Sequence, residues 1–124
     1  MLISILAAAA LWPAAAFASA KAHAASAFTA LPHWWVKQAL CIHRHESLDW
    51  HRTTDWLGYP SVDHGGMQIA VGTWVSFAPR VYPREPASAT PDQQLVVAHK
   101  IWAANGHRWG GDAWPNSSLA CGLE

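Results

Sequence analysis

The sequence has no excess of charge of either sign. Among its 124 residues, 8 Lys and Arg are balanced by 8 Asp and Glu, and charged residues make up only 13% of the chain. Proteins that hold nucleic acid or an anionic membrane by long-range electrostatics need many cations on one face. The composition therefore argues against both partners and favours a neutral one. The length is that of one domain.

Three motifs of metal or nucleophile chemistry are also missing. The chain has no His-Glu-x-x-His, no Gly-x-Ser-x-Gly and no Cys-x-x-Cys, which are signatures of zinc peptidases, serine hydrolases and thiol sites. His43 and His45 are two residues apart, so on a helix they point roughly 200° away from each other and cannot share an ion. A metal site that combines His45 and Glu46 with a distant His51 or His64 stays open as an alternative, but we expect neither a metal nor a cofactor.

The first twenty residues lack any charged side chain. An apolar block from Leu2 to Trp12, broken by Pro13, leads to Ala18-Ser19-Ala20, a pattern typical of a secretory signal peptide with an A-x-A cleavage site. The block is too short to span a bilayer comfortably. The alternative is an ordinary apolar helix of the fold.

We therefore expect a signal peptide at 1–20, a short Ala-rich tether at 21–31 and one domain at 32–124. On this interpretation the protein is exported to the cell wall or an equivalent space outside the membrane. We expect a monomer with no integral membrane span once the signal is removed.

The chain contains only two cysteines, Cys41 and Cys121, one near each end of the predicted domain. In an oxidising compartment they are natural disulfide partners. Closing such a long loop stabilises a fold by roughly 4 kcal/mol in the chain-entropy model, which matters for a domain with a modest core. Free or metal-bound thiols are the weaker alternative. A disulfide would also remove the thiolate that a cysteine nucleophile needs.

Hydrophobic periodicity predicts a mainly α fold. One amphipathic helix is expected from Pro32 to about Ser47, ending near Glu46, and a short one around 73–77. Thr90-Pro91-Asp92-Gln93 predicts a capped helix that stops at Asn105-Gly106. Residues 48–66 are predicted to form an irregular loop or a small hairpin, and the tail from Trp109 a loop. Three tryptophans at helical positions are expected in the core: Trp34, Trp74 and Trp102. Trp114 is not assigned.

Glu46 is the most promising candidate for chemistry. It stands at the end of an apolar helix in a chain with nine tryptophans. Burial among aromatic rings disfavours the ionised carboxylate and keeps a proton available near neutral pH. A surface salt bridge with Arg44 or His45 explains the residue equally well on these grounds alone.

The order of several short motifs resembles the lysozyme-like domains of resuscitation-promoting factors and related lytic transglycosylases. The resemblance covers about 32–122. Two departures stand out: Leu48-Asp49 replaces a pair of glycines, and four residues separate Cys41 from Glu46. The motifs, in chain order, are Cys41, Glu46-Ser47, Gly65-Gly66-Met67-Gln68, Thr73-Trp74, Gln93-Gln94, Asn105-Gly106, Trp114-Pro115 and Cys121.

This resemblance implies a small lysozyme-like domain that cleaves the β-1,4 bond between N-acetylmuramic acid and N-acetylglucosamine in peptidoglycan glycan strands. Glu46 would be the single acid and base, and Gln68 and Thr73 would contact the sugar. Trp50, Trp56 and Tyr59 are candidates for stacking on sugar rings, and Asp63 for lining the cleft. If water is the nucleophile, a second carboxylate is expected, from Asp49, Asp55 or Asp63.

Two other functions stay open from the sequence. The first is a peptidoglycan-binding module that has lost catalysis through the Leu48-Asp49 departure. The second is a metal-dependent envelope protein that uses His43, His45, His51 or His64.

Overall fold

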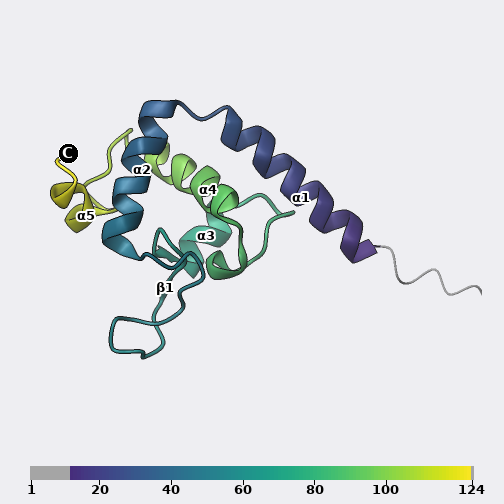
Figure 1. Ribbon diagram of the computed structural model, residues 1–124, viewed down its shortest axis with the longest axis horizontal. Coiled ribbons are helices and arrows are strands. Elements are labelled where there is room, and N and C mark those ends of the chain that lie inside the picture. The colour runs from purple at the N-terminus through teal and green to yellow at the C-terminus, as the bar shows by residue number, and fades with distance from the viewer. Residues whose placement is uncertain (1–11, 124) are drawn as a thin grey trace, which may run out of the picture.

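The structure is a computed structural model that describes residues 12–123 (Figure 1). This part of the chain is mainly helical, with one small antiparallel hairpin and one disulfide, which confirms the predicted fold class. The elements are α1 (Trp12–Thr29), α2 (His33–Glu46), β1 (Asp63–His64), β2 (Ile69–Ala70), α3 (Val71–Phe77), the 3₁₀ turn η1 (Pro86–Ser88), α4 (Pro91–Ala104) and α5 (Pro115–Ala120).

Helix α2 ends at Glu46, as its pattern predicts. Its buried positions, Trp35, Ala39, Ile42 and His43, recur at the spacing of one helix face. The prediction that Trp34 belongs to the core is wrong, because its side chain is 54% exposed. Neighbouring positions on a helix point about 100° apart. Trp35 therefore faces the core, and Trp34 does not.

Helix α4 forms where its capping sequence predicts. The Thr90 hydroxyl accepts the backbone N–H of Gln93, and the Gln93 side chain accepts the backbone N–H of Thr90. This capping box satisfies two backbone donors that a helix start otherwise leaves unpaired. Trp102 of α4 and Trp74 of α3 are buried, as predicted. Trp102 joins Trp35 and Trp109 in an aromatic cluster at the centre of the core.

Helix α1 packs against α4 and buries Ala20 and Ala24 (Figure 1). His23 Nδ1 lies 2.8 Å from the Tyr82 hydroxyl, within hydrogen-bond distance. The helix spans the end of the expected signal peptide and most of the expected tether, so residues 21–29 are helical. Residues 1–11 of the expected leader lie outside the described part of the chain, and cleavage after Ala20 stays a prediction. Within residues 12–123, every helix is too short or too polar to cross a membrane.

The segment between α2 and α3 contains the small hairpin. β1 pairs with β2 in antiparallel register, Asp63 opposite Ala70 and His64 opposite Ile69. Residues 49–62 form a loop that projects from the body of the molecule (Figure 1). The sequence allowed a hairpin or an irregular loop here, and the structure has both.

The C-terminal tail differs from its prediction as a loop. Residues 115–120 form α5, which begins with Pro115 at a first helical position, where the missing N–H costs nothing. The helix is too short for its periodicity to be visible in the sequence. Cys121 directly follows it and is bonded to Cys41 of α2, as predicted, with 6.1 Å between the two Cα atoms.

The side chain of Gln94 connects three separate segments in the interior. It is fully buried. Its Oε1 accepts the N–H of Gly66 at 2.9 Å, and its Nε2 donates to the carbonyls of Trp50 at 2.8 Å and Ala89 at 3.1 Å. These bonds hold the chain after α2, the hairpin turn and the approach to α4 around one amide.

Replacing Gln94 with Met keeps the length of the side chain but leaves three buried polar groups without a partner. Each such group costs about 1–3 kcal/mol, so we expect Gln94→Met to lower the melting temperature by at least about 10 °C. Thr90→Ala, which removes the capping hydroxyl of α4, should cost about 1 kcal/mol. Thermal melts followed by circular dichroism measure both. Equal losses in the two variants would contradict the role of Gln94.

Candidate active site

A cavity of about 350 Å³ opens beside the end of α2. Its walls come from α2, the hairpin, α3, α4 and the segment that leads into α5, so it gathers residues from nearly the whole domain. The lining residues are Glu46, Asp63, Gln68, Ile69, Ala70, Thr73, Ile101, Asp112, Ala113, Trp114 and Pro115.

Four of the residues singled out from the sequence meet in this cavity. Glu46, Asp63, Gln68 and Thr73 all line it. The sequence separates them by up to 27 positions, and the hairpin brings them together.

The three predicted stacking residues lie outside the cavity lining. Trp50 packs its ring on the His43 imidazole, with 3.8 Å between ring centroids, so at least one of its faces is covered. Trp56 is 83% exposed and Tyr59 is 65% exposed, both on the projecting loop. Their stacking role stays a prediction, and any sugar they contact would lie beyond the cavity.

The Glu46 carboxyl is half-buried at the cavity wall. Burial raises the pKa of this carboxyl above its ordinary value, and the negative charge of Asp63 raises it further. A hydrogen bond from the Ser117 hydroxyl to Glu46 Oε1, at 2.6 Å, and the charge of His45 act in the opposite direction. The net upward shift keeps a proton on Glu46 at higher pH than on an exposed glutamate, as a general acid requires.

In the turn that carries Gln68, the backbone lies close to neighbouring side chains. Gly65 has φ +78°, and an added Cβ would lie 2.4 Å from Gln94 Oε1. A Cβ on Gly66 would lie 2.4 Å from the Trp50 ring. Gln68 itself has φ +47°, a left-handed conformation uncommon outside glycine, and its amide donates to the Gly65 carbonyl at 2.8 Å. Strained backbone of this kind is concentrated at functional sites.

Two of the three candidate second carboxylates stabilise turns. Asp49 accepts the N–H of His51, and Asp55 accepts those of Leu57 and Tyr59. Neither lines the cavity. Asp63 does line it, together with Asp112, which the sequence did not single out.

Ser117 and Asp112 are the polar residues that sequence reasoning missed. Both lie in the tail that was predicted to be a loop. The only signal near them was Trp114-Pro115, and Trp114 is now placed: it is buried, lines the cavity and donates its indole N–H to the Met67 carbonyl at 2.8 Å. This bond fixes the tail against the turn that carries Gln68.

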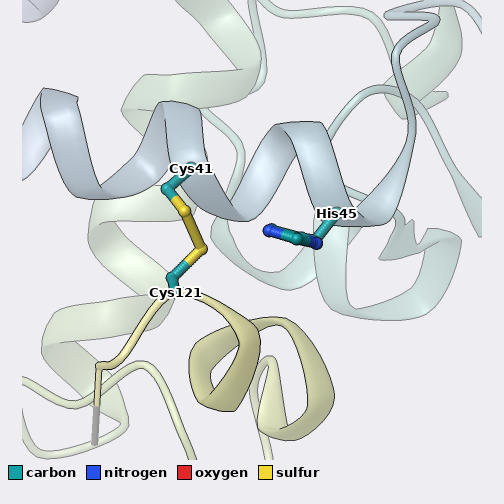
Figure 2. Close-up of side chains that lie close together, drawn as sticks. All are labelled: Cys41, His45 and Cys121. Carbon is teal, nitrogen blue, oxygen red and sulfur yellow. A yellow bond between two sulfur atoms is a disulfide. The ribbon is translucent and has the colours of Figure 1, made fainter.

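Three histidines of the metal hypothesis contact protein oxygens. His43 Nδ1 lies 2.8 Å from the Gly66 carbonyl, His51 Nδ1 lies 2.7 Å from that of Ala87, and His64 contacts Glu85. Within residues 12–123, the one group with ligand atoms close enough to share an ion is Cys41, His45 and Cys121. Figure 2 shows that its two sulfur atoms are bonded to each other beside His45, and a disulfide offers no thiolate.

The model of the transglycosylase-like domain family matches residues 52–117. The match covers more than half of the chain, and the chain belongs to this family. The matched range contains Asp63, Gln68, Thr73 and Ser117, and it begins six residues after Glu46.

Similar curated proteins are resuscitation-promoting factors, in agreement with the resemblance seen in the motifs. Rpf1 of Corynebacterium glutamicum is 37% identical over 60 residues, which are 48% of this chain and 29% of that protein. RpfC of Mycobacterium tuberculosis is also 37% identical over 60 residues, 48% of this chain and 38% of that protein. The chain therefore matches about a third of the length of these relatives. No solved structure matches it.

The hairpin beside the cavity carries a histidine whose charge state should affect stability. Nδ1 of His64 lies 2.6 Å from Glu85 Oε1 and Nε2 lies 2.7 Å from the Ser61 carbonyl, so both bonds form only when the ring is protonated. Burial by itself lowers the pKa of His64, but the bonds to Glu85 and Ser61, with the charges of Glu85 and Asp63, outweigh it and raise the pKa.

A raised folded-state pKa stabilises the protein below the unfolded value of about 6.5, and this contribution is lost as the pH rises through the folded pKa. We expect His64→Gln to lower the melting temperature clearly at a pH of about 5.5 and much less at about 8.5. Melts across this range test it, with His33→Gln, on an exposed histidine at the start of α2, as the control. A difference between wild type and His64→Gln that does not change with pH would contradict the ion pair.

Proposed function

We propose that the protein is an exported enzyme that cleaves the β-1,4 bond between N-acetylmuramic acid and N-acetylglucosamine in peptidoglycan, with Glu46 as its acid and base. The observation that carries the proposal is the Glu46 carboxyl, half-buried at the wall of a cavity with its pKa raised. Membership of the transglycosylase-like domain family and the similarity to resuscitation-promoting factors support it.

In the first step Glu46 donates its proton to the glycosidic oxygen, which leaves as a hydroxyl in place of an alkoxide. The acetamido group of the muramic acid stabilises the positive charge that develops at the sugar carbon. In the second step the ionised Glu46 takes the proton of the sugar's own C6 hydroxyl as that oxygen attacks the same carbon. The product is a 1,6-anhydro sugar, and one carboxyl suffices.

Hydrolysis is the alternative mechanism, and the cavity offers two carboxylates for it. Asp63 and Asp112 both line the wall around Glu46, and either could activate a water molecule. Asp49 and Asp55 are poor candidates, because their carboxylates hold turns.

The remaining parts of the proposal fit a neutral polymer as substrate. Gln68 and Thr73 would hydrogen-bond sugar hydroxyl or acetamido groups inside the cavity. The projecting loop, residues 49–62, connects Glu46 with Asp63, and both of these residues line the cavity. Trp56 and Tyr59 on this loop could therefore stack on sugars farther along the strand. Export is supported by the leader-like N-terminus.

Removing the acid should abolish cleavage. We expect Glu46→Gln to release muropeptides from purified peptidoglycan at least about 100-fold more slowly than wild type, since general acid catalysis contributes about 10²–10⁴-fold. Mass spectrometry of the soluble products measures this. Glu85→Gln makes the same change outside the cavity. It should retain cleavage at a temperature well below its melting temperature, which loss of the His64 pair lowers. Equal release by wild type and Glu46→Gln would refute the role of Glu46, and peptidoglycan binding without any release by wild type would identify a binding module.

Replacing Asp63 separates the two mechanisms. Its charge raises the pKa of Glu46, so Asp63→Asn should lower that pKa and move the alkaline limb of the pH profile to lower pH, with anhydro products still formed. The charges that shift the Glu46 pKa are those of Asp63 and His45, so Asp112→Asn should leave the alkaline limb of the pH profile in place. Reducing-end products, together with loss of activity in one of the two variants, would show hydrolysis with that aspartate as the base.

A further inference from the structure

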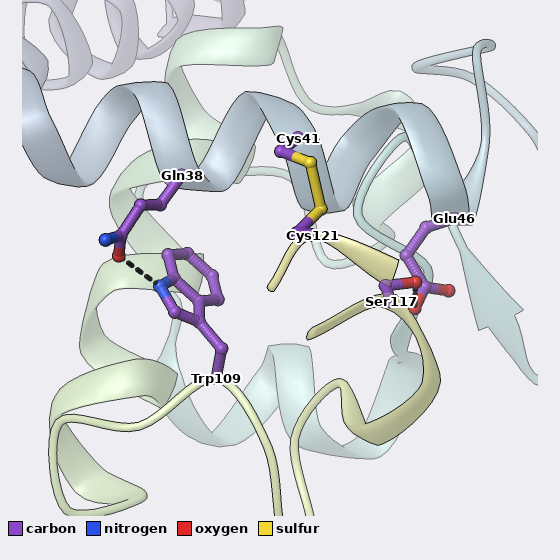
Figure 3. Close-up of a disulfide and its surroundings, with 6 residues drawn as sticks. All are labelled: Gln38, Cys41, Glu46, Trp109, Ser117 and Cys121. Carbon is purple, nitrogen blue, oxygen red and sulfur yellow. Dashed lines mark hydrogen bonds between the residues drawn. A yellow bond between two sulfur atoms is a disulfide. The ribbon is translucent and has the colours of Figure 1, made fainter. Parts of the chain in front are cut away.

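Three contacts connect the C-terminal segment to α2, and Figure 3 shows the residues that make them. The indole N–H of Trp109 donates to Gln38 Oε1 at 2.7 Å, Cys121 is bonded to Cys41, and the Ser117 hydroxyl donates to Glu46 Oε1. On α2 the three contact residues, Gln38, Cys41 and Glu46, lie successively closer to the C-terminal end of the helix.

The disulfide and the Ser117 bond form a matched pair. Glu46 follows Cys41 by five residues on α2, and Ser117 of α5 precedes Cys121, which directly follows that helix, by four. Measured along the helix axis, these spacings are about 7.5 Å and about 6 Å. The covalent link therefore holds α5 in register with the last turn of α2, at the place where Ser117 meets the carboxyl.

We propose that Ser117 is a positioning residue for Glu46, which sets the orientation of the carboxyl and selects the oxygen that carries its proton. This inference rests on the proposed function of Glu46. It stands on the 2.6 Å hydrogen bond between two side chains that are 71 positions apart in the sequence.

The bond assigns different roles to the two carboxyl oxygens. As long as the Ser117 hydroxyl donates to Oε1, the acid form of Glu46 carries its proton on Oε2. A carboxyl without this bond can rotate and place its proton on either oxygen. Fixing the rotamer and the proton together is the kind of support that an acid needs to meet a bridging oxygen in one geometry.

Burial makes the Ser117 bond hard to replace by water. Ser117 is 4% exposed although it lies on a short helix near the end of the chain. Its neighbour Ser118 is also buried, but the Ser118 hydroxyl donates to the Pro115 carbonyl within the same helix. Two adjacent serines thus differ in function: Ser118 supports α5 itself, and Ser117 contacts the carboxyl across the interface.

This difference provides a matched pair of variants, Ser117→Ala and Ser118→Ala, each of which removes one buried hydroxyl from α5. A readout that does not depend on activity is the titration of Glu46 by NMR with carboxyl-labelled glutamate, since the chain contains only three glutamates. Glu46→Gln assigns the signal. The Ser117 bond favours the ionised form, so we expect the pKa of Glu46 to rise in Ser117→Ala and to stay unchanged in Ser118→Ala.

Kinetics with peptidoglycan give the second readout. For Ser117→Ala we expect kcat to fall about tenfold, the loss of one hydrogen bond to a charged group, with KM little changed. The alkaline limb of the pH profile should move to higher pH, because the acid stays protonated longer. Ser117→Thr keeps the hydroxyl and should restore both values toward wild type. Melting temperatures separate these effects from a loss of folding.

The outcomes distinguish this proposal from the proposed function. If Glu46→Gln abolishes cleavage while Ser117→Ala keeps the wild-type kcat and Glu46 titration, the positioning role is refuted and the catalytic one stands. Equal shifts in Ser117→Ala and Ser118→Ala would also refute it, since the cause would then be a general loosening of α5. If Glu46→Gln cleaves normally, the proposed function fails, and the NMR titration still decides whether Ser117 controls the carboxyl.

Discussion

The site depends on one buried amide. Gln94 is fully enclosed and bonds the N–H of Gly66 and the carbonyls of Trp50 and Ala89. Those three backbone groups belong to the chain leaving α2, to the turn that carries Gln68 and to the approach to α4. In the interior a polar backbone group without a partner is costly, so the three segments must converge where the amide can reach them. The end of α2 and the turn that carries Gln68 thereby come to line one cavity.

Around this centre the domain encloses one carboxyl on several sides. Glu46 is the last residue of α2, Asp63 lies in β1, and Ser117 lies in α5. Burial and the Asp63 charge favour the protonated form of Glu46, whereas Ser117 and His45 favour the ionised form. In the proposed mechanism Glu46 donates a proton and later accepts one, and influences in both directions suit these two steps. The disulfide keeps the C-terminal partner in place.

Local signals in the sequence predicted the framework well. The capping residues Thr90 and Gln93 define α4, and the spacing of apolar residues defines α2 up to Glu46. The prediction failed where a segment is short: α5 has only six residues, and too few turns exist for a periodicity. The aromatic character of Trp34 suggests a core position, but the buried face of α2 belongs to Trp35.

The sequence by itself determined α2, α3, α4 and the disulfide pair, because these follow from interactions within a few residues or from the count of two cysteines. The order of short motifs along the chain singled out Glu46 as the candidate acid. Only the tertiary structure decided which side chains surround Glu46. Asp112 and Ser117 lie more than 60 positions away along the chain, and Trp50, which looked free to bind a sugar, packs on His43. Contacts over such separations depend on how helices pack, and no short-range pattern records that.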